Sequence, residues 1–253
     1  MALSSRFVNV EELSWGPSPF AGIERKELLD EPATGLQTAL FRMEPGATLP
    51  YHEHVRLEQS FILEGSLDDD EGSATAGNFV WRPPGSRHTA WAGREGALAL
   101  GFFLTPNDFL DEAADSTYDV SAGESDGTVT PHAADHEHLP PLASRFVSVE
   151  SLPWAELFEG VETKTLMDQP EVGLRMSLVR MAPGAVLPYH EHVELEQSYV
   201  LRGSLDDDEG SVTAGNYVSR PAGSRHTAWA GDDGCLVLGF FLSPNKFLDK
   251  PKL

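Results

Sequence analysis

The chain is a succession of short segments in which apolar and polar residues alternate, and this pattern predicts β-strands. Residues 23–29 and 36–43 alternate in this way, and turns rich in glycine and proline, such as the one at 44–46, separate the segments. A period of two is typical of strands that bury one face. Two apolar runs, GALALGFFL at 96–104 and GCLVLGFFL at 234–242, predict further strands. The pattern therefore predicts an all-β fold.

The whole pattern is written twice in the chain. The segment SRFVNVEELSW starts at Ser5 and the similar SRFVSVESLPW starts at Ser144, which is 139 residues later (144 − 5). The paired histidines described below are 138 residues apart (190 − 52), so one residue is lost between Trp154 and Gly160. We interpret the chain as a duplicated domain, with an N-terminal domain at 1–110, an acidic linker at 111–142 and a C-terminal domain at 143–253.

The predicted linker differs in character from the segments on either side. It is acidic, rich in small residues and poor in apolar ones, a composition typical of irregular connections. Three histidines lie in it, His132, His136 and His138. We expect them to hold a metal only weakly at best, because no predicted strand or glycine turn fixes them.

Composition supports two small packed domains and excludes some partners. The 253 residues are 40% hydrophobic, enough for ordinary cores. The formal net charge is -22, and such a surface repels nucleic acid and anionic membranes, which require clustered Lys and Arg. The first residues, MALSSRFVNVEELSW, lack the regions of a signal peptide, and no apolar run is long enough to span a membrane. We therefore expect a cytoplasmic protein that binds a small-molecule substrate or ligand.

Cys235 is the only cysteine of the chain. A single thiol excludes an intrachain disulfide and a cysteine-based zinc site. Its neighbours, GCLVLGFF, are apolar. A buried structural thiol is therefore favoured over a reactive one.

Two short motifs carry the candidate chemistry, and both halves contain them at the same spacing. The first, G-x5-H-x-H-x3-E-x6-G, runs from Gly46 to Gly65 and again from Gly184 to Gly203. The second, G-x5-P-x-G-x2-H, follows in each half. The polar residues that the motifs supply are His52, His54, Glu58 and His88 in the first half, and His190, His192, Glu196 and His226 in the second.

The spacing of these residues suits a metal site. Alternate side chains of an extended strand share a face, so His52 and His54 are predicted to reach one ion, and Glu58 keeps the same parity. A turn before His88 would let that residue complete the set from another strand. Three neutral imidazoles and one carboxylate suit Fe, Mn, Ni, Co, Cu or Zn and leave coordination positions open. A lone His-x-His pair is usually a packing or surface feature, but duplication of the whole set favours one divalent ion in each half.

The paired motifs resemble the two signature motifs of the cupin superfamily, whose members fold as small jelly-roll β-barrels with a metal inside. The resemblance implies two tandem barrels, a bicupin, related by pseudo-two-fold symmetry. It also implies that the metal ligands are the residues named above. Where the second motif usually ends with Asn, this chain has Ala92 and Ala230, which leaves the ligands intact.

More narrowly, the run from the first histidine through GFFLTPNDF, with its counterpart GFFLSPNKF, resembles the ChrR-like cupins. That group includes acetylacetone-cleaving dioxygenases and the cupin half of some zinc anti-sigma factors. The anti-sigma factors add an N-terminal domain with a cysteine-containing zinc site. Here the repeat starts within the first few residues and the only cysteine lies in the last strand, so a role in binding a sigma factor is not expected.

Between the motifs lie SLDDDEGSATAG and SLDDDEGSVTAG, each with four consecutive acids. A calcium loop is disfavoured because the oxygen spacing and the flanking helices of an EF-hand are missing. A solvated hairpin tip is predicted instead.

Several residues beside the predicted ligands have open interpretations. Trp91 either lines a pocket or packs in the core. Arg87 and Tyr51 are predicted to face away from the ion, because each neighbours a residue that points inward. Four positions near the ligands differ between the halves and predict two sites with unequal substrate pockets: Trp81 and Ser219, Pro84 and Ala222, Arg56 and Glu194, Phe61 and Tyr199.

The favoured function is that of a metal-dependent enzyme. The resemblance implies an Fe(II) dioxygenase that cleaves a small chelating ketone or diketone, with Zn2+, Mn2+ or Ni2+ as alternative ions. Redox-neutral isomerase or lyase chemistry at the same ion is a second hypothesis. A metal-containing sensor of a small ligand is a third. We expect a monomer with internal pseudo-symmetry or a homodimer.

Overall fold

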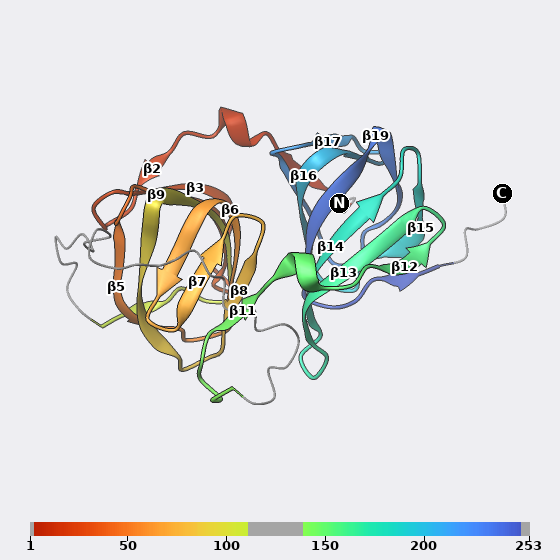
Figure 1. The fold of residues 1–253 in the computed structure, drawn as a ribbon. Coiled ribbons are helices and arrows are strands. Elements are labelled where there is room, and N and C mark those ends of the chain that lie inside the picture. The colour runs from red at the N-terminus through yellow and green to blue at the C-terminus, as the bar shows by residue number, and fades with distance from the viewer. Residues whose placement is uncertain (1–2, 111–138, 249–253) are drawn as a thin grey trace. The chain divides into compact units, whose positions relative to one another are not determined.

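The computed structural model describes residues 3–110 and 139–248, and these residues form almost only β-strands (Figure 1). Within these ranges the helical elements are short 3-10 turns at Val10–Glu12 and Val149–Ser151. No helix of this part of the chain is long and apolar enough to cross a membrane. The all-β prediction is confirmed, with two separate ten-stranded sheets.

The N-terminal barrel is one of these sheets, and its neighbouring strands run antiparallel. The hydrogen-bonded order is β11-β8-β6-β9-β4-β3-β2, while β5 pairs with β9 and β10, and β7 pairs with β6. The strands are β2 (Gly16–Pro17), β3 (Ile23–Glu31), β4 (Leu36–Met43), β5 (Thr48–Glu53), β6 (Glu58–Asp69), β7 (Gly72–Thr75), β8 (Phe79–Arg82), β9 (Arg87–Phe103), β10 (Asp108–Phe109) and β11 (Arg145–Val147).

The C-terminal barrel repeats this topology. Its order is β1-β18-β16-β19-β14-β13-β12, with β15 paired to β19 and β20, and β17 paired to β16. The strands are β1 (Arg6–Val8), β12 (Ala155–Phe158), β13 (Val161–Gln169), β14 (Leu174–Met181), β15 (Val186–Glu191), β16 (Glu196–Asp206), β17 (Ser211–Thr213), β18 (Tyr217–Arg220), β19 (Arg225–Phe241) and β20 (Lys246–Phe247).

Each barrel includes a short strand from the other half of the sequence. The compact units are Leu13–Ser151 for the N-terminal barrel, and Met1–Glu12 with Leu152–Leu253 for the C-terminal barrel. Strand β1 therefore pairs with β18, and β11 pairs with β8. The duplicated SRFV segments are exchanged, so the contacts group the chain differently from the repeat that the sequence shows.

Apolar side chains from several strands fill each barrel and hold its closing strands together. In the N-terminal barrel Ile62, Val80 and Ala92 are fully buried in one cluster, and in the C-terminal barrel Val200 and Val218 occupy equivalent positions. Gly65 permits the close approach of β6 and β9, because its φ is +65° and an added Cβ would lie 2.0 Å from the Gly96 carbonyl oxygen. The barrels are thus tightly packed scaffolds for the polar residues inside them.

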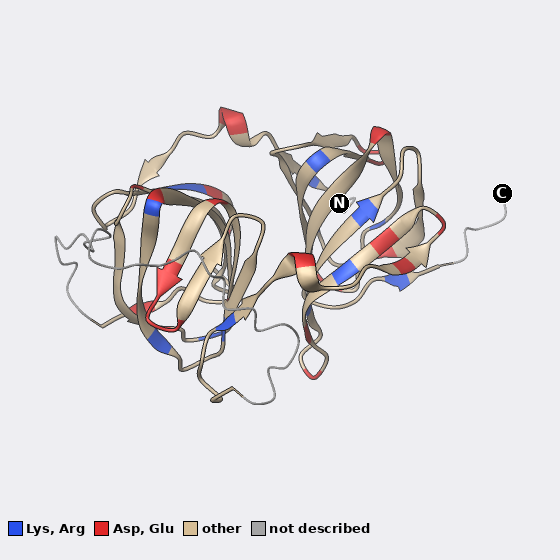
Figure 2. Ribbon diagram, in the orientation of Figure 1, with Lys and Arg blue, Asp and Glu red and all other residues tan. Residues whose placement is uncertain are grey.

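Acidic and basic residues are interspersed along the ribbon of each barrel (Figure 2). Many of the basic ones pair with acids across neighbouring strands. Arg42 pairs with Glu24, and Arg180 with Glu162. Such exposed pairs contribute little to stability, on the order of 0–1 kcal/mol each.

Candidate metal centres

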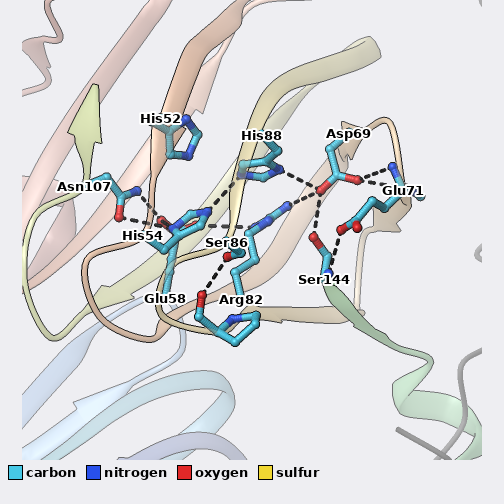
Figure 3. Close-up of polar contacts among 12 residues, drawn as sticks. His52, His54, Glu58, Asp69, Glu71, Arg82, Ser86, His88, Asn107 and Ser144 are labelled. Atoms are coloured by element: carbon cyan, nitrogen blue, oxygen red, sulfur yellow. Dashed lines mark hydrogen bonds and ion pairs between the residues drawn. The ribbon is translucent and has the colours of Figure 1, made fainter. Parts of the chain in front are cut away.

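Each barrel brings three histidines together. In the N-terminal barrel a ring nitrogen from each of His52, His54 and His88 lies within 4.8 Å of the others, and His190, His192 and His226 form the same cluster in the C-terminal barrel. The Nε2 atoms of His54 and His88 are 3.1 Å apart, and Figure 3 shows these two rings facing each other. The Nε2 atoms of His190 and His226 are also 3.1 Å apart.

Strand pairing explains why the histidines of the two motifs meet. His52 lies on β5 directly opposite His88 on β9, and the register between these strands shifts between Leu49 and His52. The strand ends at Glu53, so His54 follows one residue beyond it. The prediction assumed that His52 and His54 alternate along a single strand. Only His52 lies on β5, and His54 reaches the cluster from the segment that follows this strand.

Hydrogen bonds at the outer nitrogens fix the tautomer of all three rings in the N-terminal cluster. Nδ1 of His52 donates to the Pro50 carbonyl at 2.7 Å, and Nδ1 of His88 donates to the Asp69 carboxylate at 2.9 Å. Nδ1 of His54 lies 3.2 Å from Oδ1 of Asn107. With the proton on Nδ1 in each ring, every Nε2 presents a lone pair to the cluster.

The cluster fits a divalent metal ion. Two lone pairs at 3.1 Å repel each other unless a cation lies beside them, and Nε2 of His192 is buried with no hydrogen-bond partner. Neutral imidazole nitrogen is a preferred ligand of first-row transition ions. Nearby, two buried acids face one buried arginine in each barrel, which leaves one uncompensated negative charge: Glu58, Asp69 and Arg82, or Glu196, Asp207 and Arg220.

Burial keeps these imidazoles neutral, as metal binding requires. Desolvation lowers the pKa of His52 to about 4, although the nearby Glu58 carboxylate acts in the opposite direction. Desolvation and the positive charge of Arg82 lower the pKa of His88 to about 3. His190, in the other barrel, has a pKa lowered to about 4, also mainly by burial. These rings therefore carry no proton on Nε2 at neutral pH.

The glutamates of the motif lie beside the clusters rather than within them. Glu58 is the first residue of β6, and its Oε2 lies 3.2 Å from Nδ1 of His54, the outer nitrogen of that ring. Asn107 donates to the same oxygen at 2.5 Å. Glu196 lies in the same way 3.2 Å from Nδ1 of His192. The structure thus brings together three of the four predicted ligands in each half.

The prediction of a solvated tip for the acidic run was wrong for its first two residues. Asp68 and Asp69 are 3% and 5% exposed, because β6 extends to Asp69 and pairs with β7 before the chain turns. Only the following residues, from Asp70, form the exposed tip. Asp69 accepts from His88 and from Arg82 at 3.0 Å. Burial acts to raise the pKa of Asp69, but the hydrogen bond from His88 and the positive charge of Arg82 outweigh burial and hold this pKa below its ordinary value.

Asp69 and its counterpart Asp207 are therefore residues that contact the candidate metal centres and that the sequence analysis missed. Asp207 accepts from His226 at 2.9 Å and from Arg220 at 2.9 Å. In the N-terminal barrel Ser144, next to the exchanged strand β11, also donates its hydroxyl to Asp69 at 3.3 Å, as Figure 3 shows. The duplicated arginine at the end of each apolar strand β8 and β18 was the available signal, because a buried arginine requires an acidic partner.

A small cavity adjoins each cluster. In the N-terminal barrel it measures about 180 Å³, and its walls include Glu58, Asn107 and Phe109. The Phe109 ring lies 5.2 Å from the ring of His52. The C-terminal cavity measures about 170 Å³ and is bounded by the equivalent Glu196, Asn245 and Phe247. Each cavity is otherwise mainly apolar.

Other predictions for single residues have clear outcomes. Arg87 and Tyr51 are exposed, and Arg87 pairs with Glu53. Cys235 is buried, and burial raises the pKa of its thiol to about 12, as expected for a structural cysteine. Trp91 is half-buried and does not line the cavity. The linker histidines lie outside the described residues: His132, His136 and His138.

The residue pairs predicted to change the substrate pocket lie elsewhere. None of the eight residues at these positions belongs to the walls of the two cavities. Trp81, for example, lies under the guanidinium of Arg145, 5.6 Å from the ring centre. Its neighbour in the sheet is the exchanged strand β11, so this position lies beside that strand and not at the cavity.

Comparison with known proteins agrees with this description. A structure from Nostoc punctiforme, provisionally assigned as a dioxygenase, aligns with a TM-score of 0.72 and 18% identity over 100% of this chain and 86% of that one. A variant of oxalate decarboxylase from Bacillus subtilis aligns with a TM-score of 0.70 and 17% identity over 98% of this chain and 80% of that one. At such identities the similarity shows a shared fold. No curated protein sequence matches the chain.

The family of ChrR cupin-like domains matches twice, at residues 4–104 and 143–243. These two ranges coincide with the duplicated motifs, and each contains one complete histidine cluster. The chain therefore belongs to the ChrR cupin-like domain family, as a bicupin that carries two three-histidine clusters suited to metal ions.

Proposed function

We propose that the protein is a metal-dependent dioxygenase that cleaves a small chelating ketone or diketone, with Fe2+ as its ion. The observation that carries the proposal is that, in each barrel, a cluster of three histidine rings lies beside a mainly apolar cavity. Iron held by imidazoles keeps open coordination positions and would supply both Lewis-acid and one-electron chemistry. The residues themselves would orient the substrate and exclude water.

The cavities favour a small substrate. Their volumes, about 180 and 170 Å³, are below the roughly 300–1,000 Å³ typical of pockets for drug-sized ligands. Phe41 and Phe103 form part of the N-terminal cavity wall, and such apolar surfaces would keep water away from a reactive enolate. A diketone of a few carbon atoms fits these dimensions.

A binding function is the second candidate, and the state of the cavity carboxylate favours it. Glu58 is the acid that lines the N-terminal cavity. Burial acts to raise its pKa, but His54 and Arg82 outweigh burial and hold the pKa of Glu58 well below its ordinary value. A weak base of this kind suits general-base catalysis poorly. Chemistry in the cavity would then depend on the ion, or the protein would only bind its ligand.

Metal analysis and oxygen uptake separate these functions. The full chain, loaded anaerobically with Fe2+, should hold two ions and should consume oxygen only when a small diketone or hydroxyketone is added. The control is the double variant His52→Ala with His190→Ala, which should hold no Fe2+ at the clusters and should consume no oxygen. Tightly held zinc without turnover would favour a sensor, and substrate conversion without oxygen uptake would favour an isomerase or lyase.

A further inference from the structure

Asn107 and Asn245 contact the metal centres although no metal-ligand motif contains them. Both lie in the PN segments that follow the long strands β9 and β19. Strand β10 returns to pair with β5, so that Phe109 lies opposite His52, and the Leu110 amide donates to the Tyr51 carbonyl at 2.9 Å. These backbone contacts fix the segment over the cluster and place the Asn107 side chain between His54 and Glu58, as Figure 3 shows.

The chemistry of its neighbours determines how the Asn107 amide is oriented. An ionised carboxylate only accepts hydrogen bonds, so the amide NH2 group faces Glu58, at 2.5 Å. The amide oxygen must then face His54, where it accepts from Nδ1. The single side chain therefore ties the carboxylate to the outer nitrogen of the histidine.

Glu58 is held on both of its oxygens. Oε2 accepts from Asn107 and lies 3.2 Å from Nδ1 of His54, and Oε1 accepts from Arg82 at 3.4 Å. To bind an ion at the cluster, the carboxylate would have to give up its hydrogen bond to Asn107 and leave the outer side of the His54 ring. The second barrel has a similar arrangement around Glu196, where Asn245 donates to Oε2 and lies 3.2 Å from Nδ1 of His192. Oε1 of Glu196 accepts from the Ser198 hydroxyl at 3.4 Å and lies 3.9 Å from Arg220.

We propose that Asn107 and Asn245 hold Glu58 and Glu196 away from the ions, so that each ion is bound by three histidines and each glutamate is a positioning residue. The inference rests on the proposed metal function and replaces the predicted role of the glutamates as fourth ligands. A three-histidine centre has one more open coordination position than a centre with a bound carboxylate. A substrate that chelates through two oxygens needs these positions.

Cobalt supplies a direct probe, because the visible absorption of Co2+ reports the atoms bound to it. Each barrel is studied alone in the full chain, with the other cluster disabled by His190→Ala and His192→Ala. With Asn107 intact, the Co2+ spectra of the wild-type barrel and of Glu58→Gln should coincide. In Asn107→Ala the released carboxylate should bind, so the spectrum should change, and adding Glu58→Gln should reverse the change.

The control and the contrary outcomes are well defined. Thr105→Ala alters the same segment at a residue whose hydroxyl donates to the Leu104 carbonyl, and it should leave the spectrum unchanged. A spectrum that shifts in Glu58→Gln while Asn107 is present would overturn the inference, because Glu58 would then already be a ligand. A wild-type barrel that binds no cobalt, zinc or iron would instead refute the proposed metal function.

The second barrel keeps the test decisive if Asn107→Ala does not fold. Asn245→Ala and Glu196→Gln are then compared in a chain that carries His52→Ala and His54→Ala. The same coincidence and the same reversal are expected there. Equal spectra for Asn245→Ala and the wild-type barrel would count against the inference, since the freed carboxylate would have failed to reach the ion.

Discussion

The two barrels share the residues of the candidate metal centre but differ in the residues that line their cavities. Both contain three histidines, an aspartate behind the third histidine, a buried arginine and an asparagine. In the cavities, Phe41 and Ala99 are cross-strand partners in the N-terminal barrel, and Val179 and Val237 take their places in the C-terminal one. A large and a small residue are exchanged for two of medium size, so the volumes stay nearly equal.

Charge at the cavity wall is redistributed in a similar way. The N-terminal cavity has Arg25 and Gln37, whereas the C-terminal cavity has Thr163 and Arg175. Each cavity keeps one arginine, supplied by β3 in one barrel and by β14 in the other. The comparison indicates that both halves retain the three-histidine cluster, while the shape of the cavity and the position of its arginine have diverged.

Removing a histidine from one cluster gives the largest expected effect and tests whether both centres hold an ion. His52→Ala and His190→Ala should each reduce the metal content from two ions per chain to one, measured by elemental analysis after gel filtration. Their effects on turnover should differ, because the cavities differ. Equal residual activities would contradict that difference, and His132→Ala in the predicted linker should retain both ions.

The aspartates behind the third histidine should have the next largest effect. Asp69→Asn removes the charge that pairs with Arg82 and orients His88. Loss of such a partner costs about 10–100-fold in metal affinity, and breaking a buried ion pair costs roughly 3–5 kcal/mol of stability. Zinc affinity by chelator competition and urea unfolding measure the two effects.

The same substitution compares the two halves. Asp207→Asn should cost less, because the Ser144 hydroxyl adds a further donor to Asp69 in the N-terminal barrel. Asp70→Asn, at the exposed tip next to Asp69, is the matched control and should change neither quantity. A larger loss at Asp207 would mean that the exchanged segment does not support the first centre.

The strands and the histidine clusters could be predicted from the sequence because both follow from local spacing, whereas the barrels were implied by the resemblance to the cupin motifs. Period-two alternation specifies strands, and a duplicated motif places His52 and His88 on two of them. The role of Asp69 was not predictable in this way. A run of four acids resembles a solvated turn, and only the length of β6 decides which of them are buried.

Strand exchange was beyond the reach of the sequence for a different reason. The segments that begin at Ser5 and Ser144 are nearly identical, so either could pair with β8 or with β18. Asn107 was missed for a similar reason, because the return of β10 to β5 is a long-range pairing.

Repacking the cavity should have a smaller effect. Phe41→Val leaves a void opposite Ala99 and should lower the free energy of unfolding by about 1–3 kcal/mol. Adding Ala99→Val reproduces the pair of the C-terminal barrel and should recover part of the loss, since contacting residues couple by roughly 0.5–3 kcal/mol. Urea unfolding of the two single variants and the double variant measures this coupling. If the losses in free energy of unfolding of the two single variants simply add in the double variant, the two substitutions do not compensate each other in the cavity.

The smallest effect is expected for the cavity arginines, and it tests whether the relocated charge serves the ligand. Arg25 and Arg175 are about two-fifths exposed and already pair with Glu27 and Asp168, so each should contribute less than about 1 kcal/mol, roughly fivefold, to the binding of an anionic diketone enolate. Arg25→Thr should weaken this binding in the N-terminal barrel alone, measured by calorimetry with the C-terminal cluster disabled. Adding Gln37→Arg moves the charge to the position used in the C-terminal barrel and should restore the affinity. If the double variant binds no better than Arg25→Thr, the two arginines are surface ion pairs, and the cavities distinguish their ligands by shape.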